Sequence, residues 1–321
     1  MTETASHDYA YDMVFIAGPT ASGKSALAIK IAEMTTGAVI NTDSMQVYEG
    51  MPILTAAPDA KDYQTVPHYL FEYVDAAERY SQARWLADAT KVVGKLKARG
   101  ELPIFVGGSG LYFKAAEEGI TPMPDIPSHV QQEAEAMLAK LGSAGLYAFL
   151  TQIDPDLADR LEPGDSQRVM RGVEIWLASK QPMSMWQKQP RQGSLKGNIL
   201  KIYLRPPRDD LYDRIDDRFS MMLEKGAEAE VRAMVESRDL DAGLPAMKAL
   251  GVEALSDAIK GRCDWNEAIR LSQRDSRRYA KRQFTWFDHQ YDADMVVTDM
   301  LDEQIASETV LAIMDRLKSK N

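Results

Sequence analysis

The residues with clear chemical potential begin at a glycine-rich stretch near the N-terminus. The segment Gly18-Pro19-Thr20-Ala21-Ser22-Gly23-Lys24-Ser25 follows an apolar run and precedes a helical pattern. This is G-x-x-x-x-G-K-[ST], a phosphate-binding P-loop, in the strand, loop and helix context that such a loop requires. Its two glycines let backbone N–H groups converge on an anion at the positive end of the following helix. We therefore expect a diphosphate here, and not a glycine turn that merely starts a helix.

The polar members of this loop have separate expected roles. Lys24 would place its charge on the terminal phosphate oxygens, and the Ser25 hydroxyl would ligate a Mg²⁺ ion that bridges them. Mg²⁺ is thus the expected cofactor, with Ser25 as its protein ligand. The predicted diphosphate contacts within the loop are Gly18, Thr20, Ala21, Ser22, Gly23, Lys24 and Ser25.

An acidic residue follows the next predicted strand. The apolar segment 37–41 runs directly into Asp43-Ser44-Met45-Gln46. A carboxylate at the carboxyl end of a strand lies where open parallel sheets bind their ligands. The alternative is that Asp43 is the N-cap of a helix, a position that Asp favours. The sequence leaves both interpretations open.

A third polar group follows the buried-type strand 102–106. The strand ends in Gly107-Gly108-Ser109-Gly110, whereas a P-loop enzyme that hydrolyses nucleotides usually has an Asp there to hold the water shell of its metal. Simple nucleotide hydrolysis is therefore disfavoured. The Ser109 hydroxyl is a candidate site group, and its alternative is a place in a glycine-rich turn.

The elements around these residues predict an α/β fold with a parallel sheet flanked by helices. Apolar strands alternate with helical patterns up to residue 121, and from 122 to 197 the pattern is helical only. We expect 1–121 to be the first part of the P-loop core, 122–197 an inserted helical domain, and 198–321 the second part of the core. Segments 51–68 and 181–197 are expected to be loops.

Composition restricts the class of protein further. The chain has 321 residues, a net charge of −10 and one cysteine, Cys263, which excludes an internal disulfide and a cysteine-based metal site. No apolar run is long enough to span a membrane, and Met1–Tyr11 lacks the layout of a signal peptide, so a cytoplasmic location is expected.

The acidic total conceals a basic helix face. Six basic residues fall at helical spacing on a single face, and the segment that holds them has one acid, Asp275. Such a stripe, flanked by aromatic side chains, is typical of a surface that binds phosphates and stacks on bases, although the aromatics would also suit a core. The basic residues are Arg270, Arg274, Arg277, Arg278, Lys281 and Arg282.

Taken in order, these motifs resemble those of the tRNA dimethylallyltransferases, over about residues 11–290. The motifs are the P-loop Gly18–Ser25, Asp43-Ser44-Met45-Gln46-Val47-Tyr48, Val66-Pro67-His68, Val106-Gly107-Gly108-Ser109-Gly110-Leu111-Tyr112, Gln167-Arg168-Val169-Met170-Arg171 and Ala280-Lys281-Arg282-Gln283-Phe284-Thr285-Trp286-Phe287. The resemblance implies a nucleoside-kinase-like fold and transfer of a dimethylallyl group from dimethylallyl diphosphate to the exocyclic amine of the adenosine next to the anticodon of tRNA.

The resemblance also implies roles for individual residues. Asp43 would be the general base, Ser109 and Lys24 would belong to the catalytic set, and Arg218 would be a further diphosphate contact. The anticodon stem-loop of tRNA would lie against the residues that match the family's tRNA motifs. These are Asp43, Ser44, Met45, Gln46, Ser109, Gln167, Arg168, Val169, Met170 and Arg171, and on the basic helix Arg274, Arg278, Lys281 and Arg282.

Three other functions share parts of this pattern. A prenyltransferase acting on a free adenine nucleotide would share the P-loop and Asp43 but would need neither the insertion nor the basic stripe. A small-molecule kinase would use ATP on the same loop and close arginines over its γ-phosphate. A non-catalytic RNA-binding or nucleotide-sensing protein would not need Asp43.

We expect the protein to be a monomer. Ala57 stands where the family usually has Lys, so no phosphate contact is expected from it, and no role is set for Asp299.

Overall fold

The computed structural model describes residues 9–318, so part of the Met1–Tyr11 segment lies outside the described residues. The chain divides into two compact units. One contains the residues up to Ala116 and those from Leu195 onward, and the other is Glu117–Ser194. These limits differ by a few residues from the expected insertion 122–197.

The larger unit is built on a parallel sheet of six strands, in the order β3-β2-β4-β1-β5-β6. This confirms the predicted fold class. The P-loop strand β1 lies between β4 and β5, and β4 in turn pairs with β2. The carboxyl ends of β1, β2 and β4 therefore lie side by side. The strands are β1 (Met13–Ala17), β2 (Gly37–Asn41), β3 (His68–Tyr69), β4 (Leu102–Gly107), β5 (Ile199–Leu204) and β6 (Met295–Val297).

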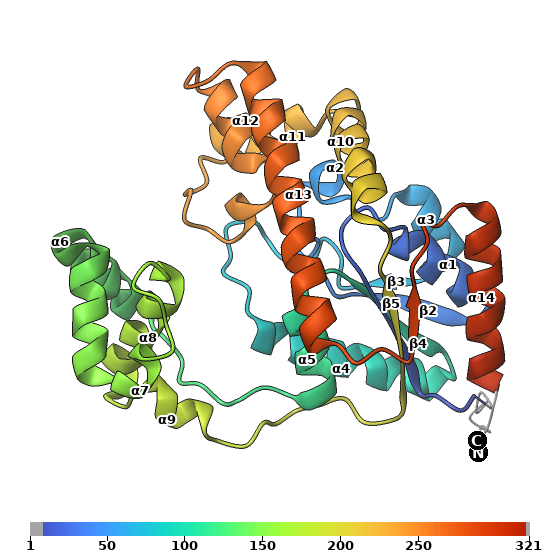
Figure 1. Ribbon diagram of the computed structural model, residues 1–321, viewed down its shortest axis with the longest axis horizontal. Coiled ribbons are helices and arrows are strands. Elements are labelled where there is room, and N and C mark those ends of the chain that lie inside the picture. Colours follow the sequence, from blue (N-terminus) through green and yellow to red (C-terminus); the bar gives the residue numbers. More distant parts are fainter. Residues whose placement is uncertain (1–8, 319–321) are drawn as a thin grey trace. The chain divides into compact units, whose positions relative to one another are not determined.

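Helices cover both faces of the sheet (Figure 1). The helices of this unit are α1 (Lys24–Thr35), α2 (Pro52–Thr55), α3 (Ala60–Thr65), α4 (Gln82–Arg99), α5 (Gly110–Glu118), α10 (Arg208–Glu224), α11 (Ala227–Arg232), α12 (Val252–Ile259), α13 (Trp265–Gln290) and α14 (Glu303–Lys318). A π-helical turn, Ala233–Ser237, continues α11, and a 3-10 turn covers Ala246–Lys248.

Alternation along each strand divides the core between the two faces, because successive side chains of a strand point to opposite sides. Val14 and Ile16 pack with α1 and α14 in one apolar cluster. Phe15, between them in sequence, points to the other face, where its ring contacts Phe105 and Phe113 at centroid distances of 5.0 and 5.4 Å. All five residues of β1 are fully buried, as a central parallel strand requires.

The smaller unit is helical and has its own core. It contains α6 (Ser128–Ile153), α7 (Pro155–Ala158), α8 (Ser166–Ser179) and α9 (Met183–Gln187). Apolar residues of α6 and α8, among them Leu146, Leu150 and Val173, are completely buried against one another. Helix α6 bends at Gly142, where φ is 66°.

Two segments expected to be loops contain short helices, so those two predictions are wrong in part. In 51–68, α2 begins at Pro52 and α3 is capped by Asp59, whose carboxylate accepts hydrogen bonds from Lys61 N–H and Asp62 N–H. In 181–197, α9 follows Pro182. Each has six residues or fewer, too short for the apolar periodicity on which the prediction rested. In 9–318, none of the helices is sufficiently long and apolar to span a membrane.

Candidate active site

The P-loop forms an anion-binding concavity between β1 and α1. Ala21 and Gly23 both adopt left-handed conformations, with φ of 63° and 90°, so the loop curls before α1 begins at Lys24. The first-turn N–H groups of a helix have no partner within the helix, and its N-terminal end carries partial positive charge. The arrangement therefore suits an anionic group, as the sequence predicts.

Two cations lie at this concavity. The Lys24 ammonium donates to the carbonyl of Pro19 at 3.1 Å, and Arg218, from α10, donates to the Thr20 hydroxyl at 3.4 Å. Burial lowers the pKa of Lys24 to about 8, with the nearby Arg218 charge acting in the same direction and Asp43 opposing it. Burial also lowers the pKa of Arg218, and Asp43 again opposes the shift. Two half-buried cations, of which Arg218 lowers the pKa of Lys24, favour an anion between them.

The serines of the loop have hydroxyls that are available to a ligand. Ser22 is 1% exposed, and its hydroxyl has no hydrogen-bond partner among the described residues. A buried hydroxyl without a partner is costly, so a phosphate oxygen would satisfy it. Ser25 lies in the first turn of α1 with an exposed side chain. Its hydroxyl suits a Mg²⁺ ion, whose preferred ligands are oxygens.

A Mg²⁺ ion at Ser25 would need ligands from the substrate. Within residues 9–318 no group of three His, Cys, Asp or Glu side chains could hold a metal without further ligands. Mg²⁺ usually binds through one or two protein oxygens together with phosphate oxygens and waters. Asp299 lies exposed after β6 and belongs to no such group.

Asp43 lies at the end of β2 in a backbone turn held by Asn41. The side chain of Asn41 accepts from the N–H of Asp43 at 2.7 Å and donates to its carbonyl at 2.9 Å. The Asp43 Oδ1 atom accepts from the N–H of Met45 at 2.9 Å. No helix starts here, because the next one begins at Pro52, so the N-cap alternative for Asp43 is wrong. In the part of the chain described, Oδ2 has no hydrogen-bond partner.

Ser109 lies next to the Asp43 turn. Its hydroxyl accepts from the N–H of Ser44 at 2.9 Å, and its own N–H donates to the carbonyl of Thr42 at 3.1 Å. A Cβ atom at Gly107 would lie 2.2 Å from the carbonyl of Thr42, so the close approach of the two loops requires glycine there. The glycine-rich end of β4 thus brings Ser109 beside Asp43, and no acidic side chain occupies the place found in hydrolysing enzymes.

The residues after Asp43 are fixed in part by α2. Gln46 donates to the carbonyls of Thr55 and Ala56 at 3.0 and 2.8 Å. The side chains of Ser44, Met45 and Gln46 are all half-buried. Gln46 therefore orders this loop in the free protein.

Helix α13 completes the site with Gln283, for which the sequence predicts no role, and with Tyr279, which the sequence predicts only as an aromatic flanking the basic stripe. Gln283 is 4% exposed and hydrogen-bonds both the P-loop and the loop before Ser109. One turn earlier on the helix lies Tyr279, and burial and the Asp43 charge raise the pKa of its phenol, with Ser109 and Gln283 acting in the opposite direction. Gln283 belongs to the motif that begins at Ala280, and Tyr279 immediately precedes that motif. Membership of this motif is the feature of the sequence from which a site role for both residues could have been predicted.

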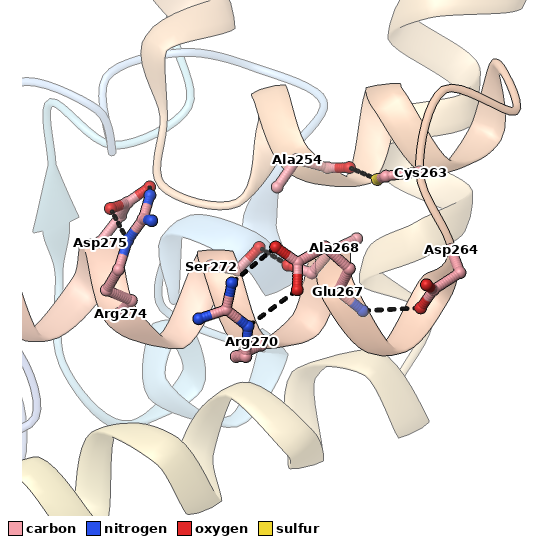
Figure 2. A network of polar contacts seen from close by, with 9 residues as sticks. All are labelled: Ala254, Cys263, Asp264, Glu267, Ala268, Arg270, Ser272, Arg274 and Asp275. Atoms are coloured by element: carbon pink, nitrogen blue, oxygen red, sulfur yellow. Dashed lines mark hydrogen bonds and ion pairs between the residues drawn. The ribbon is translucent and has the colours of Figure 1, made fainter.

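Most of the predicted basic stripe is engaged in ion pairs within the protein. Figure 2 shows Arg270 directed toward Glu267 and Arg274 directed toward Asp275, with the nearest atoms 2.6 and 2.9 Å apart. Arg278 also reaches Asp275, at 3.5 Å, and Arg277 pairs with Asp216 of α10.

Two cations of the stripe lack such a partner. Among the described residues, Lys281 and Arg282 are exposed and form no ion pair. The guanidinium of Arg282 lies over the ring of Tyr279, 5.5 Å from its centroid. They are the cations of α13 most available to a phosphate.

The aromatic residues near the stripe belong mainly to the core. Phe284 and Phe287 are 2% and 1% exposed, so the expectation that they provide a stacking surface is wrong. Trp286 is half-buried and packs on Gly110, where a Cβ atom would lie 2.1 Å from the indole.

The predicted tRNA-binding motif of the smaller unit lies on α8. Gln167 and Arg168 are exposed, and Arg171 is half-buried. Arg168 pairs with Asp165 at 3.4 Å and Arg171 with Glu174 at 3.3 Å. Val169 is 1% exposed in the core of this unit, and Met170 packs against the same core. The face offered to a partner therefore consists of the polar members of the motif.

Together, the parallel sheet, the anion-binding loop after β1 and the carboxylate after β2 define a P-loop enzyme with an acidic side chain near its anion-binding loop. The family model for IPP transferases matches residues 46–290, and that for isopentenyl transferases matches residues 11–78. The chain belongs to the IPP transferase family.

Named relatives agree with this assignment. The chain is 48% identical to the tRNA dimethylallyltransferase of Nitrobacter hamburgensis, over 88% of its own length and 89% of the relative. It is 46% identical to the tRNA dimethylallyltransferase of Azorhizobium caulinodans, over 86% of its length and 89% of the relative. The family is thus one of prenyltransferases that modify tRNA.

Solved structures show the same fold. The full-length tRNA isopentenylpyrophosphate transferase of Bacillus halodurans superposes with a TM-score of 0.67 at 34% identity, covering 96% of this chain and 97% of that one. A eukaryotic dimethylallyltransferase acting on tRNA gives a TM-score of 0.78 at 27% identity, covering 94% of this chain and 78% of that one.

Proposed function

We propose that this protein transfers a dimethylallyl group from dimethylallyl diphosphate to the exocyclic amine of the adenosine on the 3′ side of the tRNA anticodon, releasing diphosphate. The observation that carries the proposal is that hydrogen bonds connect the P-loop to the Asp43 turn: Gln283 bonds both Thr20 and Gly108, and Ser109, which follows Gly108, accepts from the N–H of Ser44, which follows Asp43. A base therefore lies beside the two cations of the leaving-group site. The amine nitrogen forms a bond to C1 of the prenyl group, the C1–O bond breaks, and the amine loses one proton.

In this proposal, the P-loop binds the diphosphate. Negative charge grows on the departing diphosphate, so groups directed at it stabilise the transition state more than the ground state. Lys24, Arg218 and the unpartnered hydroxyl of Ser22 are the side chains positioned for this. The backbone N–H groups that the curled loop directs inward add to them.

Ser25 would hold the Mg²⁺ ion, together with the oxygens of the diphosphate. When bound, the ion would neutralise charge on the leaving group. The exposed Ser25 hydroxyl at the start of α1 supports this assignment.

Asp43 receives the amine proton through its free Oδ2, while Oδ1 stays bonded to the N–H of Met45. An adenine amine is a poor nucleophile, and a carboxylate within hydrogen-bond reach both orients it and removes its proton. The adenine must leave its stack to reach this point, as bases do in other enzymes that modify them. Ser109, beside Asp43, is placed to contact the extruded base.

We further propose that α13 binds tRNA phosphates in the larger unit through Arg274, Arg278, Lys281 and Arg282, and that α8 contributes Gln167, Arg168 and Arg171 in the smaller unit. A free mononucleotide would need neither set, and these surfaces therefore favour a tRNA acceptor. We expect the enzyme to act in the cytoplasm as a monomer, which light scattering of the purified protein would test.

The experiment that tests the proposed function follows radiolabelled dimethylallyl diphosphate into bulk tRNA. Parallel reactions offer adenosine monophosphate as acceptor and ATP as a phosphoryl donor. We expect Mg²⁺-dependent label in tRNA, lost in a tRNA whose adenosine next to the anticodon is replaced by guanosine. Label in the mononucleotide alone, or phosphate release from ATP alone, would contradict the tRNA assignment.

A further inference from the structure

The side chain of Gln283 connects two loops of the active site. Its Oε1 atom accepts a hydrogen bond from the N–H of Thr20 at 2.9 Å, and its Nε2 atom donates to the carbonyl of Gly108 at 3.0 Å. The side chain is 4% exposed. Both ends of one buried amide are therefore satisfied, each by the backbone of a different loop.

The fit around this amide is close. A Cβ atom at Gly108 would lie 2.0 Å from the Nε2 atom of Gln283, so only glycine admits the bond. The backbone of the Gly108 loop lies directly against the amide. A buried polar group that has both of its hydrogen-bond partners is rigid. Loss of one partner costs free energy, because the other donor or acceptor is then buried without a hydrogen bond.

The contact lies where the sheet no longer holds the loops together. In the β1–β4 ladder, the final paired residues are Ala17 and Gly107. Thr20 and Gly108 come after this pair, beyond the last strand residues. In this region the two hydrogen bonds of the Gln283 amide join the loops, whereas backbone pairing joins the strands within the sheet.

Each loop carries one half of the proposed reaction site. On one side, the Thr20 hydroxyl accepts from Arg218 at 3.4 Å, and Thr20 belongs to the diphosphate loop. On the other, Gly108 precedes Ser109, whose hydroxyl accepts from the N–H of Ser44 at 2.9 Å, next to Asp43. Hydrogen bonds joined by short backbone links thus connect the leaving-group site to the turn that carries Asp43, with Gln283 between them.

We propose that Gln283 is a positioning residue that fixes the separation between the diphosphate-binding loop and the Asp43 base. The inference rests on the proposed function, because a set separation matters only if both sites serve one transfer. Group transfer depends on reacting atoms held within a few tenths of an ångström, and a misplacement of about 1 Å lowers the rate by about 100-fold.

An amide is required, because one end must accept and the other must donate. Methionine, of similar length, does neither. An ionised glutamate can accept from Thr20 N–H but faces the carbonyl of Gly108 without a proton to donate. Protonated glutamic acid restores that donor. Gln283→Glu is therefore a variant whose defect depends on pH in a direction that the geometry fixes.

The test compares Gln283→Met and Gln283→Glu with the wild type in single-turnover transfer from dimethylallyl diphosphate to tRNA. Gln273→Met is the matched control, since Gln273 is on the same helix and donates to a backbone carbonyl, that of Asp216, at 3.2 Å, but touches neither loop. We expect Gln283→Met to lose between about 10-fold and 100-fold in rate. Its tRNA dissociation constant should stay within about twofold of wild type, and Gln273→Met should keep the wild-type rate.

The pH profile separates positioning from a general loss of structure. The rate of Gln283→Glu, divided by the wild-type rate at each pH, should increase as pH falls and the glutamate gains its proton. A ratio independent of pH would overturn the inference, even if Gln283→Met does not fold. Loss of tRNA affinity in proportion to the rate would also overturn it. An inactive wild type would instead contradict the proposed function.

Discussion

The Ser109 hydroxyl accepts a hydrogen bond from the backbone N–H of Ser44 at 2.9 Å, across two loops that follow neighbouring strands. Asp43 immediately precedes Ser44, so this bond holds the turn that carries the proposed base. We predict that Ser109→Ala lowers kcat by about tenfold, because the turn loses one of its attachments. Ser109→Thr keeps the hydroxyl and should retain most of the activity. Equal activity of the two variants would show that the hydroxyl is not required.

The role of Asp43 is tested most cleanly by asparagine. Asp43→Asn keeps an acceptor for the N–H of Met45, which is 2.9 Å from Oδ1 in the native turn, and removes the negative charge and the ability to take a proton. We predict a loss in kcat of about 10²-fold to 10⁴-fold with unchanged tRNA binding.

Asp75→Asn is the matched control for Asp43→Asn. Asp75 forms the same kind of local turn, accepting from the N–H of Ala77 at 2.7 Å, but it is not part of the proposed site. This variant should keep wild-type kcat in the same assay. Near-normal turnover by Asp43→Asn with saturating tRNA would exclude Asp43 as the general base.

The sequence was sufficient to predict the sheet because central parallel strands are buried on both faces. Their side chains are then apolar without interruption, as in β1 and β4, and such runs are visible without any tertiary information. The short helices were not visible in this way. The first turn of α2 is held by Glu230 of α11, which accepts from the N–H groups of Ile53 and Leu54 at 2.8 and 2.9 Å. Contacts between such distant segments leave no local periodicity.

The same distinction applies to the site. The P-loop and Asp43 could be predicted because their chemistry depends on a local spacing or on the end of a strand. Gln283 acquires its place by contacts with Thr20 and Gly108, which are 263 and 175 residues away. The phosphate-binding stripe was predicted from charge spacing alone, which does not show that Arg277 pairs with Asp216 of α10.

The lowered pKa of Lys24 predicts an alkaline limit to substrate capture. Burial brings the pKa of this ammonium from its ordinary value of 10.5 to about 8. Below pH 8 the free enzyme therefore carries the charge, and as pH rises through 8 the charge is lost and the diphosphate binds less well. We predict that kcat/KM for dimethylallyl diphosphate falls above about pH 8, because this ratio reports groups of the free enzyme.

Saturating substrate should move that limit. A bound diphosphate favours the charged ammonium and raises the pKa of Lys24, so kcat should decline only at higher pH than kcat/KM does. In Lys24→Arg the limit should disappear, since arginine keeps its proton throughout this range. An alkaline decline that is identical in Lys24→Arg and wild type would show that another group controls it.

The final prediction concerns which cations of α13 meet the tRNA. Lys281 and Arg282 are exposed and, within residues 9–318, without ion pairs, whereas Arg270 is held by two hydrogen bonds to Glu267 at 2.8 and 2.6 Å. Each cation that neutralises a phosphate releases counterions, which contributes about 0.7 to 0.9 to the slope of log K against log salt. We predict that Lys281→Ala and Arg282→Ala each reduce the slope by about this amount.

Arg270→Ala provides the control on the same helix. Its guanidinium is already neutralised by Glu267, so the salt dependence of tRNA binding should be unchanged in this variant. Filter binding of tRNA between low and moderate salt measures all three slopes. Equal reductions in all three variants would mean that the ion pair with Glu267 opens on binding and that the whole stripe contacts phosphate. No reduction in Lys281→Ala and Arg282→Ala would remove this part of α13 from the tRNA interface, because a cation that contacts no phosphate cannot contribute to the slope.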